Sequence, residues 1–242
     1  MITPQIADIW VYLSARPLLW LTLTLVAYQG GYAIYRHFGF HPLLNPVALA
    51  IVALVGTLAL SGTPYQTYFD GAQFVHFLLG PATVALAVPL YAQFDKLRAL
   101  LVPLGGALVV GSVTAIVSVL GIGWALGVAD ATLLSLAPKS VTTPIAMGIA
   151  EKIGGIPSLT AVLVILTGIS GAVMAKYVLD ALGIADHSVR GFAVGIAAHG
   201  IGTARAFQVS EQAGAFSGLA MGLNGAATAL LAPALLALWR VL

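Results

Sequence analysis

The feature that most constrains this chain is a lysine placed between two prolines inside an apolar run. Residues 137–151 read APKSVTTPIAMGIAE, and the twelve residues before them are apolar apart from a few polar side chains such as Asp130. Proline cannot donate a backbone hydrogen bond and clashes with the preceding helical turn. Pro138 and Pro144 therefore predict a helix that is broken here. Backbone groups freed inside a bilayer must bond to neighbouring groups, water or a ligand.

The side chains at this break predict a pocket for an anion. A lysine inside a membrane is costly and is usually functional, and Lys139 is joined by the hydroxyls of Ser140, Thr142 and Thr143. The helix that resumes near Pro144 would present unpaired N–H groups and the positive end of its dipole, and Thr142 and Thr143 can cap it.

Simpler interpretations of the same residues stay open. Lys139 could lie at a loop and extend to the membrane surface, and the hydroxyls could bond to their own backbone. A Ser–Lys nucleophilic pair is disfavoured, because adjacent residues of a helix do not face each other. An intramembrane hydrolase would need a nucleophile and a base that the sequence does not place together.

Composition assigns the chain to the integral membrane proteins. Of its 242 residues, 60% are hydrophobic and 7% are charged, whereas a soluble domain has about 25% charged residues. The formal net charge of +2 comes without a basic patch and excludes nucleic-acid binding. The sequence has no cysteine, no metal-ligand spacing and no nucleotide-binding fingerprint. We therefore expect no cofactor, no metal and no enzymatic activity.

The apolar segments predict an all-α, polytopic membrane protein with a single domain over residues 1–242. A membrane-spanning helix needs about 20 apolar residues, and at least two of the segments are expected to be discontinuous helices. Residues 1–16 are expected to lie peripherally in the membrane interface. The eight predicted segments are 17–35, 46–61, 73–94, 99–120, 130–152, 158–182, 191–209 and 215–239.

The stretches between these segments predict where the chain turns. The charged group around Lys96, the glycines of residues 121–127, the polar residues 186–190 and residues 211–214 are expected to form loops or turns. If every segment crosses, Lys96 and Arg190 face opposite sides, but the charge difference is too small to fix an orientation. Gly168, Ser170 and Gly171 are suited to close helix packing.

Two further interruptions resemble the Lys139 break. Residues 80–83 (GPAT) and 198–205 (AHGIGTAR) contain Thr83, His199 and Thr203. His199 is either a packed histidine or a proton carrier, because its charge changes near neutral pH. Short echoes between residues 79–84 and 136–141, and between GPAT and GIGT, suggest an internal repeat. Asn224 could form a hydrogen bond within the last segment, but the sequence shows no partner.

Five ordered motifs resemble the LrgB/CidB family, and the resemblance covers nearly the whole chain. They are LLGPATVALAVPLY (78–91), PKSVTTPIA (138–146), GGIPSLTAV (154–162), AHGIGTARA (198–206) and GAFSGLAMGLNG (214–225).

The resemblance implies a multi-pass protein of the bacterial inner membrane. Members of the family were named as antiholin-like regulators of murein hydrolase activity that act with a small holin-like LrgA/CidA partner. A similar plastid protein exchanges glycolate and glycerate, and other relatives are linked to pyruvate uptake. The family more often has Ser-His where this chain has Ala198 and His199, so a strict role for that hydroxyl is in doubt.

Together, the residues and the resemblance give the hypothesis of a secondary transporter of small monocarboxylates such as glycolate, glycerate, lactate or pyruvate. Lys139 would bind the carboxylate with Ser140, Thr142 and Thr143, and His199 would carry a coupling proton or bind substrate directly. Thr83 and Thr203 would complete the pocket. The alternative is a pore or a regulator of murein hydrolase export. The expected partners are the substrate, membrane lipid, a holin-like subunit and a second copy of the chain.

Overall fold

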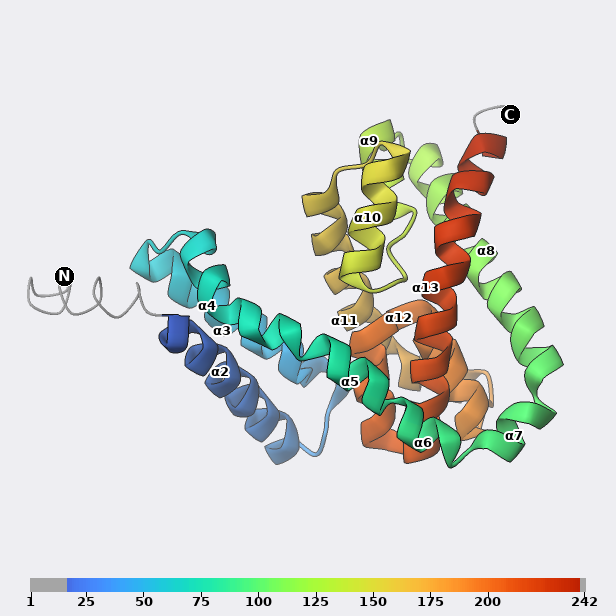
Figure 1. Cartoon of the computed structure of the whole chain (residues 1–242), viewed down its shortest axis with the longest axis horizontal. Helices are drawn as coiled ribbons and strands as arrows, with labels where there is room; N and C mark the ends of the chain where they lie inside the picture. The colour runs from blue at the N-terminus through green and yellow to red at the C-terminus, as the bar shows by residue number, and fades with distance from the viewer. Residues whose placement is uncertain (1–16, 240–242) are drawn as a thin grey trace, which may run out of the picture. The chain divides into compact units, whose positions relative to one another are not determined.

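The computed structural model describes residues 17–239, and all regular structure in this part of the chain is helical (Figure 1). This confirms the predicted all-α class. The chain divides after Ala85 into two compact units, which we call unit 1 (residues 17–85) and unit 2 (residues 86–239).

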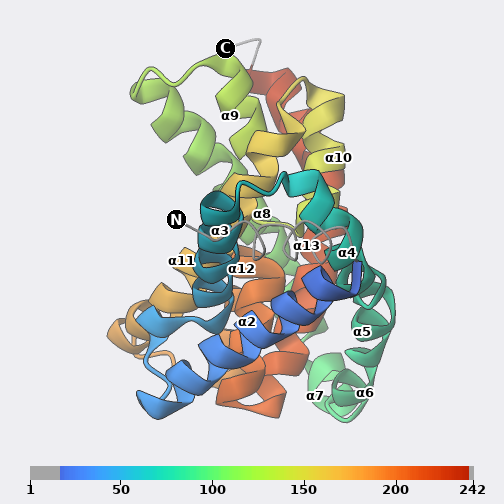
Figure 2. The same cartoon turned by 90° about the vertical axis from the view of Figure 1, so that its left-hand side faces the viewer.

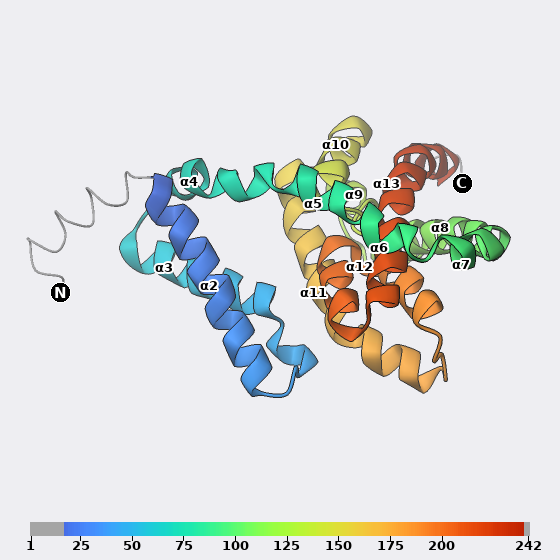
Figure 3. The same cartoon turned by 60° about the horizontal axis from the view of Figure 1, so that its bottom comes forward.

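Unit 1 is a small helical cluster built on a hairpin of α2 and α3, which lie side by side in Figure 3. The side chain of Asn45 caps α3 by accepting from the N–H groups of Val47 and Ala48. Its helices are α2 (Pro17–His37), η1 (Pro42–Leu44), α3 (Pro46–Ser61), α4 (Tyr65–Phe77) and α5 (Leu79–Ala85).

Aromatic side chains and glycines hold unit 1 together. Trp20 is fully buried and meets Tyr68 edge-on, with ring centroids 5.8 Å apart. The hydroxyls of Thr24 and Tyr68 lie 3.2 Å apart. A side chain at Gly31 would lie 2.8 Å from the carbonyl oxygen of Pro46, so this glycine allows α2 and α3 to approach closely.

Unit 2 is built around three long helices, α8 (Leu101–Ala125), α11 (Pro157–Ala181) and α13 (Glu211–Trp239). Each is long and apolar enough to cross a membrane. The remaining helices are α6 (Ala87–Tyr91), α7 (Phe94–Ala99), α9 (Asp130–Leu136), α10 (Thr143–Ile153) and α12 (His187–Val209).

Helices α9 and α10 form a hairpin with a non-helical tip at residues 137–142. The chain that follows α10 comes back beside the end of α9, where the N–H of Ile156 donates to Ser135 Oγ at 2.8 Å. The hydroxyl of Thr160 donates to the carbonyl of Ser135 at 3.1 Å. We call this excursion hairpin A.

Helix α12 is itself a hairpin, folded back at His199, whose φ of 40° and ψ of −133° are not helical. In a straight helix, residues eight apart are separated by about 12 Å. Here a Cβ on Gly202 would lie 3.2 Å from the carbonyl oxygen of Val194. Ser217 of α13 likewise contacts Thr203 through its hydroxyl and lies against Gly195. We call α12 hairpin B.

The two hairpins enter unit 2 from opposite ends. In Figures 1 and 2, α9 and α10 lie at the end of unit 2 that holds the C-terminus of α13, and much of α12 lies toward the end that holds α6 and α7. Each hairpin follows a 25-residue helix, α8 or α11. The order of a long helix and then a hairpin thus occurs twice in opposite directions. This repeat does not coincide with the sequence echoes, which involve α5 of unit 1.

Several predicted boundaries were wrong. Residues 73–94 contain parts of four helices, with helical structure interrupted at Leu78, at Leu86 and at residues 92–93. Residues 121–125 continue α8 instead of turning, because Gly123 gives room to Leu133 of α9 and the turn comes at Gly127, where φ is 70°. The expected loop at 211–214 belongs to α13, since Ser210 Oγ accepts from the N–H of Ala213 and starts the helix.

The expectation that Lys96 and Arg190 face opposite sides of the membrane, which assumed eight crossings, was also wrong. Lys96 lies in α7 and forms an ion pair of 2.9 Å with Asp186, which precedes hairpin B. Arg190, at the start of the same hairpin, pairs with Asp180 at 2.7 Å. Lys96 and Arg190 therefore lie at the same end of unit 2. The predicted peripheral segment, residues 1–16, lies outside the described residues.

Glycines allow hairpin B to pack against α13 without intervening side chains. A Cβ on Gly195 would fall on the carbonyl oxygen of Ser217, and a Cβ on Gly191 would fall on that of Ala213. Such contacts through small residues are a common way for membrane helices to associate.

We predict that Gly195→Ala lowers the stability by at least about 2 kcal/mol, because the added methyl group must push two backbones apart. Thermal unfolding of the purified protein in detergent measures this. Gly222→Ala is the matched control, since a Cβ there meets nothing within 4 Å, and it should be neutral or stabilising by up to about 1 kcal/mol. Equal unfolding temperatures for the two variants would contradict the packing.

A second prediction concerns Asp186, whose carboxylate caps hairpin B by accepting from the N–H groups of Ser188 and Val189. The Ser188 hydroxyl and the Lys96 ammonium, with these N–H groups, hold the pKa of Asp186 well below its usual range. A lowered pKa stabilises the fold above the unfolded value of about 3.9, and the contribution is lost as the pH falls further.

We therefore expect Asp186→Ala to cost about 1 kcal/mol, as loss of an N-cap does. The difference from the wild type should be constant between about pH 5 and 7 and should shrink below about pH 4. Unfolding temperatures measured across this range test the prediction. Asp95→Ala is the control, because this exposed carboxylate has no ion-pair partner within the described residues. A difference that does not change with pH would refute the role of the carboxylate charge.

Candidate functional site

The tips of the two hairpins meet at Asn224, near the middle of α13. Its amide nitrogen donates to the carbonyl of Ser140 in hairpin A at 3.1 Å and to the carbonyl of Ile196 in hairpin B at 3.0 Å. In an unbroken helix, the Ile196 carbonyl would accept from the N–H of Gly200. The fold-back at His199 interrupts this pattern, and Asn224 supplies the donor.

The oxygen of the same amide is also satisfied. It accepts from Ser112 of α8 at 2.7 Å and from Thr228 at 3.3 Å. Asn224 is 1% exposed and Ser112 is fully buried, so all four hydrogen-bonding positions of the amide are used inside the core. Sequence reasoning left Asn224 without a role, although a lone amide in a long apolar helix was itself the signal.

His199 lies at the tip of hairpin B and faces α11. Its Nε2 lies 2.9 Å from the carbonyl oxygen of Val164. Because a carbonyl only accepts, Nε2 carries the proton in this contact. Gly168 makes room for the ring, since a Cβ there would lie 2.7 Å from its Cε1. Of the three small residues predicted to support close packing of α11, Gly168 and Gly171 therefore do so at this tip.

The predicted hydroxyl residues have different surroundings. Thr203 is buried, and its hydroxyl donates to the carbonyl of His199 at 2.8 Å and lies 2.9 Å from the hydroxyl of Ser217. Thr142 occupies the N-cap position of α10, but its side chain makes no capping hydrogen bond, which corrects that part of the prediction. Thr143 is the first residue of α10, and Thr83 lies in α5 of unit 1.

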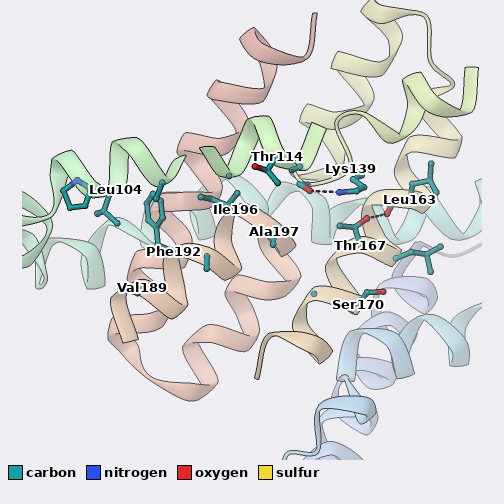
Figure 4. Close-up of a pocket in the computed structure, with 18 of the residues that line it drawn as sticks. Leu104, Thr114, Lys139, Leu163, Thr167, Ser170, Val189, Phe192, Ile196 and Ala197 are labelled. Carbon is teal, nitrogen blue, oxygen red and sulfur yellow. Dashed lines mark hydrogen bonds between the residues drawn. The ribbon is translucent and has the colours of Figure 1, made fainter. Parts of the chain in front are cut away.

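A cavity of about 930 Å³ lies between α8, α11 and the first half of hairpin B, with Lys139 and Ser140 in its wall (Figure 4). Lys139 is the one charged side chain among the described residues that line it. Thr142, Thr143, His199 and Thr203 are outside this lining within the described chain. The cavity therefore brings together two of the predicted site residues, and it adds Thr114, Thr167 and Ser170.

Lys139 forms no ion pair among the described residues. Its Nζ donates to the hydroxyl of Ser140 at 3.2 Å, and the ion pairs found in the described residues involve Lys96, Lys176 and Arg190 but not Lys139. The surrounding tip is fixed by buried neighbours, since Val141 is fully buried and Ala137 is 2% exposed. A partly buried ammonium without a carboxylate partner favours a charged ligand.

Comparison with known proteins identifies the family. A model of the LrgB-like family matches residues 24–238. The chain belongs to the LrgB family. This confirms the resemblance seen in its motifs. The family and the apolar helices together indicate a multi-pass membrane protein.

Individual relatives match over most of their length. The chain is 39% identical to the uncharacterized protein YwbG of Bacillus subtilis (strain 168), over 89% of this chain and 96% of that protein. It is 30% identical to the antiholin-like protein LrgB of Bacillus cereus (strain B4264), over 91% of this chain and 96% of that protein. No solved structure matches the chain.

We predict that Asn224→Ala lowers stability by about 2 kcal/mol, because it leaves two carbonyls and two hydroxyls buried without this partner. Thermal unfolding in detergent should show a fall of about 4–8 °C. Thr228→Val keeps the side-chain volume and removes one long hydrogen bond, so it should cost less than about 1 kcal/mol. An Asn224→Ala variant as stable as the wild type would contradict the bridging role.

Proposed function

We propose that this protein is a secondary transporter of small monocarboxylates, of the glycolate, glycerate, lactate and pyruvate class, in the bacterial inner membrane. The observation that carries the proposal is the meeting of two oppositely directed hairpins at the middle of three long apolar helices. Pairs of interrupted helices with opposite orientation are typical of secondary transporters, and their breaks form the substrate site near the bilayer midplane.

Lys139 supplies the charge that this site needs. It follows the end of α9 and precedes Ser140, whose carbonyl accepts from Asn224 near the middle of α13. This depth supports transport over the interpretation of a lysine that reaches the membrane surface. We propose that the Lys139 ammonium binds the substrate carboxylate by a charge-assisted hydrogen bond. Ser140 is proposed to hold the hydroxyl or keto oxygen of the substrate, and Thr142 and Thr143, which lie outside the cavity lining, remain proposed members of the site.

His199 is the proposed coupling residue. Its ring lies at the tip of the other hairpin, where a change of protonation would alter the hydrogen bond to Val164. Thr203 is linked to it, because the Thr203 hydroxyl donates to the carbonyl of His199. Coupling to a proton, a holin-like partner and a homodimer all stay proposals.

A second candidate function comes from the names of the relatives. Several are called antiholin-like protein LrgB, which favours a regulator of envelope permeability that acts with a holin-like subunit. Such a pore or regulator would give a graded leak that does not saturate. A carrier gives saturable uptake that depends on its anion-binding residue, so one assay distinguishes the two functions.

The test is uptake of labelled glycolate, lactate and pyruvate into proteoliposomes, with and without a pH gradient. We expect saturable uptake by the wild type. Lys139→Gln should weaken apparent affinity by about 10–100-fold, because it removes a charge-assisted hydrogen bond worth about 1.5–3 kcal/mol. Lys152→Gln is the matched control, since Lys152 is exposed and lies at the end of α10.

His199→Gln separates coupling from binding in the same assay. It should keep exchange of labelled for unlabelled substrate and lose the response to the pH gradient. Uptake that does not saturate and is equal in Lys139→Gln would reject the carrier and favour the pore. Each variant is first compared with the wild type for thermal stability in detergent, so that an unfolded variant is not scored as a transport defect.

A further inference from the structure

The cavity beside Lys139 is much larger than a molecule such as glycolate. Its volume is about 930 Å³, and all but five of its nineteen lining residues are apolar. A small hydroxy acid would leave most of this apolar surface without contact. The lining therefore indicates a ligand with more to bury than a carboxylate and one hydroxyl.

Polarity changes from one end of the cavity to the other. In Figure 4, Lys139 and Thr167 lie toward one end with Leu163, Thr114 lies between Lys139 and Ile196, and Leu104, Phe192 and Val189 lie at the other end. The hydroxyls of Thr114 and Ser170 make no hydrogen bond within the described residues, so they are available to a ligand. The distance along α8 from Leu104 to Thr114 is about 15 Å.

Small residues are prominent in the lining of the cavity, namely Ala107, Gly111, Gly171, Ala193 and Ala197. Ile196 lies against Gly111, since a Cβ on that glycine would lie 3.1 Å from the Ile196 Cγ2. We call the apolar part of the lining the trough. An unbranched chain is the slimmest tail that can follow it past Ile196.

We propose that the site binds monocarboxylates with an unbranched apolar tail, the carboxylate at Lys139 and the tail along the trough toward Leu104 and Phe192. This inference rests on the proposed anion site and extends its substrate class from small hydroxy and keto acids to amphiphilic ones. The charge at one end selects the carboxylate, and the apolar wall selects the tail.

The selectivity follows from the energetics of the two ends. Each methylene group removed from water contributes enough to tighten binding by about fourfold. The gain continues with chain length until the tail fills the trough. A second charge at the far end of the tail would have to be buried against Leu104 and Phe192, which is unfavourable without a partner.

The experiment measures binding of acetate, butyrate, hexanoate and octanoate to the protein in lipid nanodiscs, by competition with radiolabelled octanoate. Protein-free nanodiscs correct for partitioning into lipid. We expect affinity to rise about fourfold for each added methylene group. Octanedioate and octanol should both bind at least about tenfold more weakly than octanoate, because one carries a second charge and the other carries none.

Three variants locate the site. Lys139→Gln should reduce octanoate binding by at least about tenfold. Ala193→Leu fills the trough and should remove the gain from hexanoate to octanoate while leaving acetate binding unchanged. Ala234→Leu is its matched control, because Ala234 is exposed on α13 and lies outside the cavity lining, and it should bind all four acids as the wild type does.

The outcomes separate this inference from the proposed function. Saturable transport of lactate or glycolate with no dependence of affinity on chain length would overturn the inference and leave the carrier intact. Octanoate binding that is equal in Lys139→Gln, or equal for octanol, would also overturn it and point to a membrane lipid or a partner helix in the trough. Chain-length-dependent binding without any transport would support the amphiphile site and reject the carrier.

Discussion

The fold of unit 2 depends on one buried amide. Two hairpins that come from opposite ends leave backbone carbonyls exposed where their helices stop, and such groups cannot stay unpaired in an apolar interior. Asn224 satisfies one carbonyl from each hairpin and accepts from Ser112 of α8. The same interaction that satisfies the breaks also fixes how far apart the two tips lie. The breaks in the helices are stable here because a side chain of another helix, α13, supplies the hydrogen-bond donor that the broken helices lack.

Close packing makes this interaction geometrically accessible. Gly191 and Gly195 bring hairpin B against the backbone of α13, so Asn224 reaches the Ile196 carbonyl with a side chain of only moderate length. Gly168 does the same between α11 and His199. The glycines therefore act at helix contacts, and positive φ values are confined to a few turns such as Gly127 and Gly154. Glycines that suggest flexibility in the sequence instead allow short distances between helices in the structure.

Features set by neighbouring residues in the sequence were predicted, whereas features set by contacts between distant residues were not. Helix α3 begins and ends where its apolar run does, and the interruption at Pro138 is present as residues 137–142. The fold-back of α12 was not predictable in position, because AHGIGTAR contains two glycines and the turn occurs at His199 instead. The partner of Asn224 lies 84 residues away at Ser140, and no periodicity along one chain shows such a pair. The cavity could not be predicted either, since its walls come from three separate helices and the tip of hairpin A.

The order of Asn224 and its partners along the chain has a consequence for biosynthesis. Ser112, Ser140 and Ile196 all leave the ribosome before Asn224 does, because they precede it in the sequence. Until α13 is in place, the carbonyls of Ser140 and Ile196 must use temporary partners, such as water. The two hairpin tips therefore join only once α13 has been made, and a chain that stops short of α13 has two hairpins but nothing to join them.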